Sequence, residues 1–438
     1  MQEKVSAWFD ESSKKGAWSS SALSITKSWL DKGFQPRAIT RDLKWGVPIP
    51  KVDGLSEEEY RNKVFYVWFD ACIGYPSITN TYTADWEKWW KNPDNVELFQ
   101  FLGKDNVQFH SCVFPASQIG TGDNWTKVHR ISATEYLNYE NGKFSKSRGV
   151  GVFGNNAKDT GIDPDIWRFY LLSRRPETAD SEFKWEEFID TNNNELLKNV
   201  GNLCQRVLKF CVAKMDGLVP DAGSYTDEVL DAHKENARRV LGEYITHMEA
   251  TRLRFGVADI LTFSGLGNKL LQDNKLDGRL LTEQPERCKA VIHLALHHIH
   301  LLASLLAPYM PGVTANILSQ LNLPNATTDA RIPDPADWKF DALPAGHKLG
   351  TPAALFATIP AAKLEEWRDA YGGEELKRQK ALAAEKLAAK KAKKLEQKEK
   401  KRLEKEKQQQ EKDKVQDGVA KLAIDEKKQE TEPKATGS

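Results

Sequence analysis

Two short apolar runs with a helix-like stretch between them indicate an α/β fold for the first part of this 438-residue chain. The runs are FYVWFDA at residues 65–71 and ELFQFLG at 97–103, and the intervening segment is ADWEKWWKN. Such runs, rich in Val and Phe, are typical of strands buried in a parallel sheet. KVHRISATEYL at 127–137 adds a third predicted strand, which a turn at Asn141-Gly142 follows.

The pattern becomes helical after Asp163. Asp163 is predicted to cap a helix that has Pro164 in its first turn. Apolar residues then recur at helical spacing over residues 192–215, 228–254, 257–271 and 287–307. We therefore expect an α-helical bundle from Asn192 to about Gln320.

The C-terminal part has a different composition. Residues 374–417 contain no Gly or Pro and consist mostly of strong helix formers. They predict an isolated, solvent-exposed helix roughly 65 Å long. The segment before it, 346–373, is predicted to wrap irregularly and to end in a break at Gly372-Gly373, and residues 418–438 are predicted to be disordered.

Charge is distributed unevenly along the chain. Residues 377–438 contain 20 Lys and Arg against 12 Asp and Glu, a net charge of +8, while the rest has 43 against 50, a net charge of −7. An acidic body with a basic tail suggests a polyanionic partner that is reached through the tail. A tail that only keeps the protein soluble is the alternative, and composition leaves both open.

Cysteine, histidine and hydropathy patterns exclude several classes of protein. The five cysteines form no CxxC pair, which argues against a disulfide framework and a Cys-based zinc site and favours the cytosol. His293, His297 and His300 repeat at helical spacing among Leu, Ile and Ala, so we expect packing rather than metal binding. No secretory or transit pattern opens the sequence, and no run of 18 apolar residues predicts a membrane span.

GKFSKSRG at residues 142–149 has the chemistry of a mobile phosphate clamp. Lys143 and Lys146 are flexible point charges, and glycines at both ends permit motion. A solvated turn is the alternative. KFSKS resembles the Lys-Met-Ser-Lys-Ser motif of class I aminoacyl-tRNA synthetases, with Phe144 at the apolar Met position. The resemblance implies Lys143 and Lys146 as catalytic residues, ATP with Mg²⁺, and ATP contacts from Lys143, Ser145, Lys146 and Ser147.

Two further blocks resemble the methionyl-tRNA synthetases in particular. FYVWFDACIGYPS at 65–77 is similar to their methionine-pocket strand, and FLGKDNVQFHSCVFPA at 101–116 is similar to the following nucleotide turn. The resemblance implies that Gly103 and Asp105 contact ATP. It also implies that methionine is bound by Trp68, Ala71, Cys72, Tyr75 and His110. Without the resemblance, an aromatic strand and a lone histidine would be interpreted as plain core.

The helical segment NVGNLCQRV at 199–207 resembles the anticodon-facing helix of the same family. Asn202 and Arg206 are four residues apart, so they share a helix face. The resemblance implies that both read anticodon bases, and that Leu276 stands where bacterial members have a stacking Trp. An ordinary solvated face is the alternative. Residues 377–407, with 14 Lys and Arg against 5 acidic residues, are expected to follow the tRNA backbone.

The His-x-Gly-His motif that class I synthetases use on ATP phosphates does not occur in these 438 residues. The first strand of the nucleotide fold and the zinc-bearing inserted domain also have no counterpart here. We therefore expect a chain truncated at its N-terminus that is inactive alone, exposes an apolar sheet edge, is poorly stable and has no zinc site.

The predicted architecture is an α/β Rossmann-like half-domain, the C-terminal part of a class I catalytic domain, at residues 1–190. An α-helical anticodon-binding bundle at 191–345, the wrapping segment at 346–373, the basic helix at 374–417 and the tail at 418–438 follow it. The predicted activity is that of a eukaryotic cytosolic-type methionine–tRNA ligase, which forms methionyl-adenylate from methionine and ATP and transfers methionine to tRNA(Met). A non-catalytic tRNA-binding protein and a class I synthetase for another amino acid are the alternatives. A cytoplasmic location without membrane association is expected.

Overall fold

A computed structural model describes residues 1–54, 56–140, 142–323, 325 and 330–429. The chain divides into two compact units. The first contains residues 1–144 and 151–366, and the second contains residues 145–150 and 367–438. Each unit is described by itself.

The α/β part of the first unit contains three two-stranded sheets. β3 (Leu98–Gly103) and β4 (Val128–Thr134) pair in parallel, as do β5 (Leu137–Tyr139) and β6 (Ser181–Phe183), while β1 (Thr40–Arg41) and β2 (Val64–Phe65) are antiparallel. The predicted strands at 97–103 and 127–137 are thus confirmed as β3 and β4. Short helices surround the sheets: α1 (Gln2–Lys15), α2 (Ser20–Lys32), α3 (Glu57–Tyr60), α4 (Val67–Asp70), η1 (Ala71–Ile73), α5 (Gly74–Tyr82), α6 (Glu87–Trp90), η2 (Lys104–Asn106), η3 (Phe109–Val113), α7 (Phe114–Thr121), α8 (Gly154–Asp159), α9 (Pro164–Ser173) and α10 (Trp185–Asp190).

The prediction of one buried parallel strand over residues 65–71 is wrong. β2 ends at Phe65, where it pairs with β1, and α4 begins at Val67. An apolar run of this length suits a short strand and a helical turn equally well. The exposure of Trp68, at 51%, also differs from that of a strand buried on both faces.

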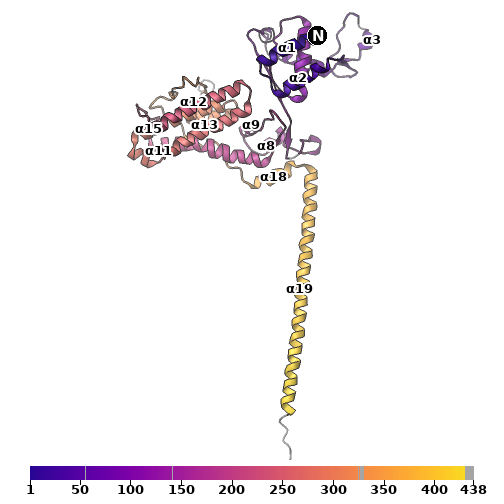
Figure 1. Cartoon of the computed structure of the whole chain (residues 1–438), viewed down its shortest axis with the longest axis vertical. Helices are drawn as coiled ribbons and strands as arrows, with labels where there is room; N and C mark the ends of the chain where they lie inside the picture. Colours follow the sequence, from indigo (N-terminus) through magenta and orange to yellow (C-terminus); the bar gives the residue numbers. More distant parts are fainter. Residues whose placement is uncertain (55, 141, 324, 326–329, 430–438) are drawn as a thin grey trace, which may run out of the picture. The chain divides into compact units, whose positions relative to one another are not determined.

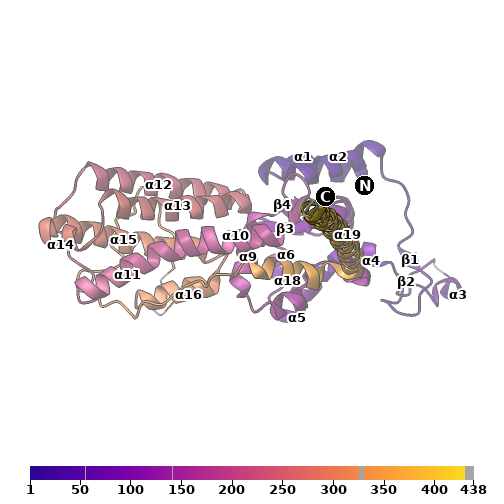
Figure 2. The ribbon, with the colours of Figure 1, turned by 90° about the horizontal axis from the view of Figure 1, so that it is seen from below.

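Helices form most of residues 164–320, as predicted. α9 begins after its cap Asp163, whose carboxylate accepts a hydrogen bond from the Asp165 amide at 2.8 Å. η5, a π-helical segment, continues without a break from α10 into α11. The bundle elements are η5 (Thr191–Gly201), α11 (Asn202–Lys214), α12 (Glu228–Glu249), α13 (Leu253–Asp273), α14 (Gly278–Glu283), α15 (Pro285–Leu306) and α16 (Pro311–Gln320). α12, α13, α15 and α11 pack alongside one another (Figures 1 and 2).

α15 forms the centre of the bundle. By length and composition it is the one helix among the described residues that is apolar enough to cross a membrane, yet 83% of that apolar stretch is buried inside the fold. His297 donates from Nδ1 to the His293 carbonyl at 2.8 Å and accepts at Nε2 from the Leu343 amide at 3.0 Å. The expected packing role of this histidine is therefore confirmed.

Arginine side chains join the α/β part to the bundle. Arg130 of β4 is buried, and its guanidinium donates to the carbonyl of Gly16 and, at 2.5 Å, to that of Glu249. Arg168 of α9 donates to the carbonyls of Pro308 and Tyr309 at 2.9 Å each. These bonds satisfy carbonyls near helix ends, which would otherwise lack partners.

The second unit contains η4 (Lys146–Arg148) and the long helix α19 (Gly373–Gln429), which is labelled in Figure 1. Val150 forms a bridge with Gly372. A side chain at Gly373 would lie 2.6 Å from Val150, and this glycine has a φ of +77°, so glycine suits the close approach.

The C-terminal predictions are correct in kind but wrong in extent. Residues 346–373 are not irregular throughout, because α18 forms at Ala362–Tyr371. α19 continues through Gly418 to Gln429, so disorder is wrong for residues 418–429. A single Gly costs a helix only about 1 kcal/mol, and helix formers continue after it. Residues 430–438, also predicted to be disordered, and Asn141 of the predicted turn lie outside the described residues.

Candidate functional site

A hollow of about 460 Å³ lies beside η2, which directly follows β3. Gly103 at the end of β3 pairs with Thr134 at the end of β4, and the carboxyl ends of parallel strands are the usual ligand edge of an α/β sheet. The structure therefore brings Trp68 and Asp105, which were predicted from separate motifs, to one cavity. Its lining residues are Ile25, Trp68, Lys104, Asp105, Asn106, Gln108 and Phe109.

Polar side chains that follow β3 and β4 hold one another. The Tyr136 hydroxyl donates to the Asp105 carboxylate at 2.7 Å. Lys104 donates to Glu135 at 2.5 Å and lies 3.4 Å from Asp180. The hydrogen bond with Glu135 raises the pKa of Lys104, and the same bond lowers the pKa of Glu135. Asp105 thus accepts a hydrogen bond from the neutral Tyr136 hydroxyl, and its neighbour Lys104 is already paired with Glu135.

Aromatic side chains form the adjoining wall. The ring of Trp68 lies 5.1 Å from that of Phe109. His110, in the π-helical η3, donates from Nδ1 to the Asn106 carbonyl at 2.8 Å, so its Nε2 accepts from the Tyr75 hydroxyl, also at 2.8 Å. Burial lowers the pKa of His110. Burial thus favours the neutral imidazole, and both of its nitrogens are engaged within the protein.

Ala71 and Cys72 differ in exposure although they are neighbours. Ala71 is exposed, whereas Cys72 is 3% exposed and its thiol lies 3.7 Å from the Phe109 carbonyl. Burial raises the pKa of Cys72 to about 12. Because the thiolate is the reactive form, Cys72 cannot serve as a nucleophile at neutral pH.

The KFSKS loop is ordered around Phe144. That ring lies 5.2 Å from Tyr139 and 5.8 Å from Phe153, which confirms the apolar packing expected at the Met position of the motif. Lys143 is exposed and belongs to the first unit, one residue before the chain passes into the second. In the second unit, Ser145 and Val150 exchange two backbone hydrogen bonds, at 2.8 and 3.0 Å.

Within the loop that these two bonds close, Lys146 and Ser147 are exposed. Ser145 accepts from the Arg148 guanidinium at 3.0 Å. Gly149 adopts a φ of +64°, a left-handed conformation that favours glycine. The lysine side chain is thus presented to solvent by a tight, closed turn.

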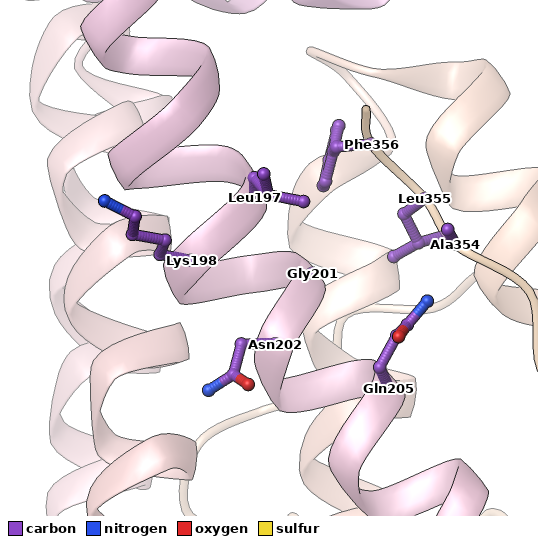
Figure 3. Close-up of a pocket in the computed structure, with 8 residues that line it drawn as sticks. All are labelled: Leu197, Lys198, Gly201, Asn202, Gln205, Ala354, Leu355 and Phe356. Carbon is purple, nitrogen blue, oxygen red and sulfur yellow. The ribbon is translucent and has the colours of Figure 1, made fainter. Parts of the chain in front are cut away.

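A second cavity, of about 540 Å³, lies on the bundle where η5 passes into α11 (Figure 3). In Figure 3, Gln205 extends from the helix toward Ala354 and Leu355, and Lys198 and Asn202 extend from its other side. A side chain at Gly201 would lie 3.2 Å from the Phe356 ring, so glycine permits the segment to pack closely. We call this cavity the α11 groove, and its lining residues are Leu197, Lys198, Gly201, Asn202, Gln205, Ala354, Leu355 and Phe356.

The predicted pair on this helix is accessible. Asn202 is exposed and donates from Nδ2 to Asn268 Oδ1 at 3.2 Å. Arg206 is exposed, and within the described part of the chain no hydrogen bond or ion pair holds its guanidinium. Leu276 is half-buried after α13, where its amide donates to the Leu271 carbonyl at 3.0 Å.

Potential metal ligands are dispersed. Among the residues that the structure describes, no three His, Cys, Asp or Glu side chains are grouped so that they could hold a metal ion. All five cysteines are free and buried.

Comparison with known proteins identifies the family. The family model described as "tRNA synthetases class I (M)" matches residues 1–208, and the model described as "Anticodon binding domain of methionyl tRNA ligase" matches residues 219–376. The chain belongs to the class I methionyl-tRNA synthetase family.

Curated relatives from this synthetase family are similar over most of the chain. It is 49% identical over 379 residues to the probable cytoplasmic methionine–tRNA ligase of Schizosaccharomyces pombe, with 85% of this chain and 46% of the relative covered. It is 45% identical over 380 residues to the human cytoplasmic methionine–tRNA ligase, with 86% and 41% covered. The chain thus spans about half the length of the curated relatives that it matches.

Solved structures of methionyl-tRNA synthetases share the fold. The Mycobacterium tuberculosis enzyme in complex with methionyl-adenylate aligns with a TM-score of 0.68 and 23% identity, covering 81% of this chain and 66% of that one. Its apo form aligns with a TM-score of 0.66 and 21% identity, covering 82% and 67%. At these identities the likeness establishes the fold, a class I half-domain followed by a helical domain.

The site residues predicted from the sequence motifs do not include several residues at the two cavities. Lys104 and Tyr136 could have been found, because Lys104 directly follows the predicted strand at 97–103 and Tyr136 is near the end of the predicted strand at 127–137, and the carboxyl ends of these strands must lie together. Gln205 is three residues from Asn202 but extends from the other side of the helix (Figure 3), so that spacing gave no signal for it. Asn268 carried no sequence signal, because it meets Asn202 only through the packing of α13 against α11.

Proposed function

We propose that this chain supplies the second half of the catalytic domain and the anticodon arm of a cytoplasmic methionine–tRNA ligase. The observation that carries the proposal is the hollow shared by Trp68 and Asp105, with the Tyr75–His110 pair in the adjoining wall. The relatives reported above are named methionine–tRNA ligases, which favours methionine over another amino acid. Residues 1–190 would hold the small substrates, and residues 191–345 the anticodon. The C-terminal part would consist of the wrapping segment at 346–373, the basic helix at 374–417 and the tail at 418–438.

Methionine would lie against the aromatic wall. A thioether is polarizable and gains from contact with rings, which suits Trp68 and Tyr75, and the small Ala71 between them in the sequence would leave room for the ligand. Tyr75 already donates its proton to His110, so its oxygen is left to accept the substrate's ammonium proton. His110 would orient Tyr75, and Cys72 would pack behind the wall.

ATP would bind at the carboxyl ends of β3 and β4. Gly103 leaves open space for close approach of a ligand, and Asp105 would accept a hydrogen bond from the ribose. The KFSKS loop would contact the phosphates through Lys143, Ser145, Lys146 and Ser147. Mg²⁺ would be held mostly by phosphate oxygens, as it commonly is, which agrees with the dispersed carboxylates of the described residues.

The reaction has two steps. The methionine carboxylate attacks the α-phosphorus of ATP, which forms methionyl-adenylate and releases pyrophosphate. The terminal ribose hydroxyl of tRNA then attacks the acyl carbon and releases AMP. Lys146, assisted by Lys143, would stabilise the charge that grows on pyrophosphate, and positioning and electrostatics rather than a covalent nucleophile would supply the acceleration.

tRNA(Met) would be held at two places. Asn202 and Arg206 would contact splayed anticodon bases beside the α11 groove, with Leu276 contributing apolar contact in place of a stacking ring. α19, whose described side chains are exposed from Lys377 onward, would follow the phosphate backbone without sequence preference.

Alone, this chain would not activate methionine, because it contains no His-x-Gly-His motif. Among the described residues β3 pairs with β4 alone, and Phe99 and Phe101 of β3 are 37% and 54% exposed. An open apolar strand edge is prone to association, so the isolated chain would also be poorly stable.

A chimera tests the proposal. This chain replaces the matching half of the fission yeast relative, to which it is 49% identical, and methionine-dependent ATP–pyrophosphate exchange is measured. We expect exchange with methionine but not with Ile, Val, Leu or Cys, and none from the chain alone. Lys146→Ala should slow exchange by about two to three orders of magnitude, while Lys158→Ala on the exposed face of α8 is the matched control. Exchange with another amino acid, or with the isolated chain, would contradict the proposal.

A further inference from the structure

A chain of polar side chains behind Asn202 links α13 to the helix that carries the α11 groove. Asn199 donates from Nδ2 to the Leu261 carbonyl at 3.1 Å. A backbone carbonyl only accepts, so Asn199 Oδ1 must face the other way. There it accepts from the fully buried Ser264 hydroxyl at 2.9 Å and from Asn268 Nδ2 at 3.0 Å.

Asn268 is oriented by the same logic. Its Nδ2 also donates to the backbone carbonyls of Asn199, at 3.0 Å, and of Ser264, at 3.3 Å. With its nitrogen among acceptors, its Oδ1 faces outward and accepts from Asn202 Nδ2 at 3.2 Å. The direction of every bond in this relay is thus determined by backbone groups inside the bundle.

The consequence lies at the exposed end of the relay. An unconstrained Asn amide can turn over and exchange the positions of its donor and acceptor. Asn202 cannot do so without losing its bond to Asn268. Its second N–H and its Oδ1 therefore face solvent in fixed positions that cannot be exchanged.

We propose that Asn268 is a specificity-determining positioning residue, which makes Asn202 discriminate between two classes of anticodon base. Cytosine and adenine offer an exocyclic amine beside a ring-nitrogen acceptor, whereas guanine and uracil offer a carbonyl beside a ring N–H. If the N–H and Oδ1 of Asn202 are held in fixed positions, they match the donor and acceptor of only one class of base at a given anticodon position. An amide that turns freely can match both classes. The inference rests on the proposed function, because it assumes that Asn202 faces an anticodon base.

The test uses the full 438-residue chain and short anticodon stem-loop RNAs, which carry CAU or a replacement at one of its positions. Affinities are measured by fluorescence anisotropy at about 0.2 M salt, where backbone attraction is weakened. We expect Asn202→Ala to reduce discrimination at one position about tenfold. Asn268→Ala should reproduce that loss at the same position with unchanged affinity for a scrambled loop. The double variant should lose no more than either single variant.

Two further variants separate positioning from a general structural role. Asn268→Asp keeps an oxygen for Asn202, so it should retain more discrimination than the variants that lack one. Asn268→Leu, which has a similar volume but no acceptor, replaces Asn268→Ala if the alanine variant does not fold. Asn236→Ala is the control, because among the described residues Asn236 bonds only to the Ala232 carbonyl of its own helix.

The inference alone is overturned if the parent chain discriminates and the folded Asn268 variants discriminate equally well. An equal loss of affinity for all loops, or additive effects in the double variant, also overturns it. A parent chain that binds CAU and scrambled loops equally overturns the proposed anticodon function, and the inference with it.

Discussion

Acid should destabilise the helical bundle through its buried imidazoles. His233, His297 and His298 are 7%, 1% and 0% exposed. Burial lowers the pKa of His233 and of His297 to about 4, and it holds the pKa of His298 well below its ordinary value. Near His297, the charged forms of His293 and His300 would oppose its protonation and Asp341 would favour it.

The folded and unfolded chains protonate these histidines at different pH. Unfolded histidine takes up a proton below about pH 6.5, while the folded bundle resists protonation until about pH 4. Protonation therefore favours the unfolded chain. The free energy of unfolding is highest above about pH 6.5, where the histidines are neutral in both states, and it decreases as the pH falls toward 4. At pH 5 the loss is about 2 kcal/mol for His233 and about the same for His297.

Urea unfolding at pH 7.5 and pH 5.0, followed by circular dichroism, measures this loss. His297→Gln should reduce the acid loss by about 2 kcal/mol, because Gln does not titrate. The substitution also disturbs the bond to the Leu343 amide and so lowers stability at pH 7.5. This loss does not affect the result, because each variant is compared with itself at the two pH values. His129→Gln, on β4 outside the bundle, is the matched control. If parent and His297→Gln lose the same free energy between the two pH values, the assignment of the acid loss to this imidazole is refuted.

Three further predictions concern the proposed activity. In the chimera, Lys146→Ala should slow ATP–pyrophosphate exchange by about two to three orders of magnitude with a nearly unchanged KM for methionine, and an unchanged rate would exclude Lys146 as the pyrophosphate clamp. Tyr136→Phe removes the 2.7 Å bond to Asp105 and should raise the KM for ATP about tenfold but not that for methionine. Its control is Tyr225→Phe, at the 3.3 Å pair with Asp227 in the bundle, which should change neither. Truncation after Gly372 should flatten the dependence of log affinity for tRNA on log salt and preserve discrimination between anticodons, whereas an unchanged slope would show that α19 does not contact tRNA.

Local patterns in the sequence were sufficient to predict most of the elements. The cap at Asp163, the strands β3 and β4 and the bundle helices were predicted because capping, hydrophobic spacing and helix propensity act within a few residues. The KFSKS, methionine-pocket and anticodon-helix motifs were each contiguous, so their resemblance to the synthetase family was visible without a fold. The packing of Phe144 followed in the same way.

Tertiary structure decided what depends on distant segments. The predicted strand at 65–71 did not form, because β1 pairs only with Val64 and Phe65. The chain continues from Val67 as a helical turn. The bond between Tyr75 and His110 joins residues 35 apart, and the bond between Asn202 and Asn268 joins residues 66 apart. Hydrogen-bond partners of this kind are selected by packing, which buries some polar atoms and leaves others at a surface. A linear sequence therefore names the candidate side chains, but only the fold determines which of them hold one another.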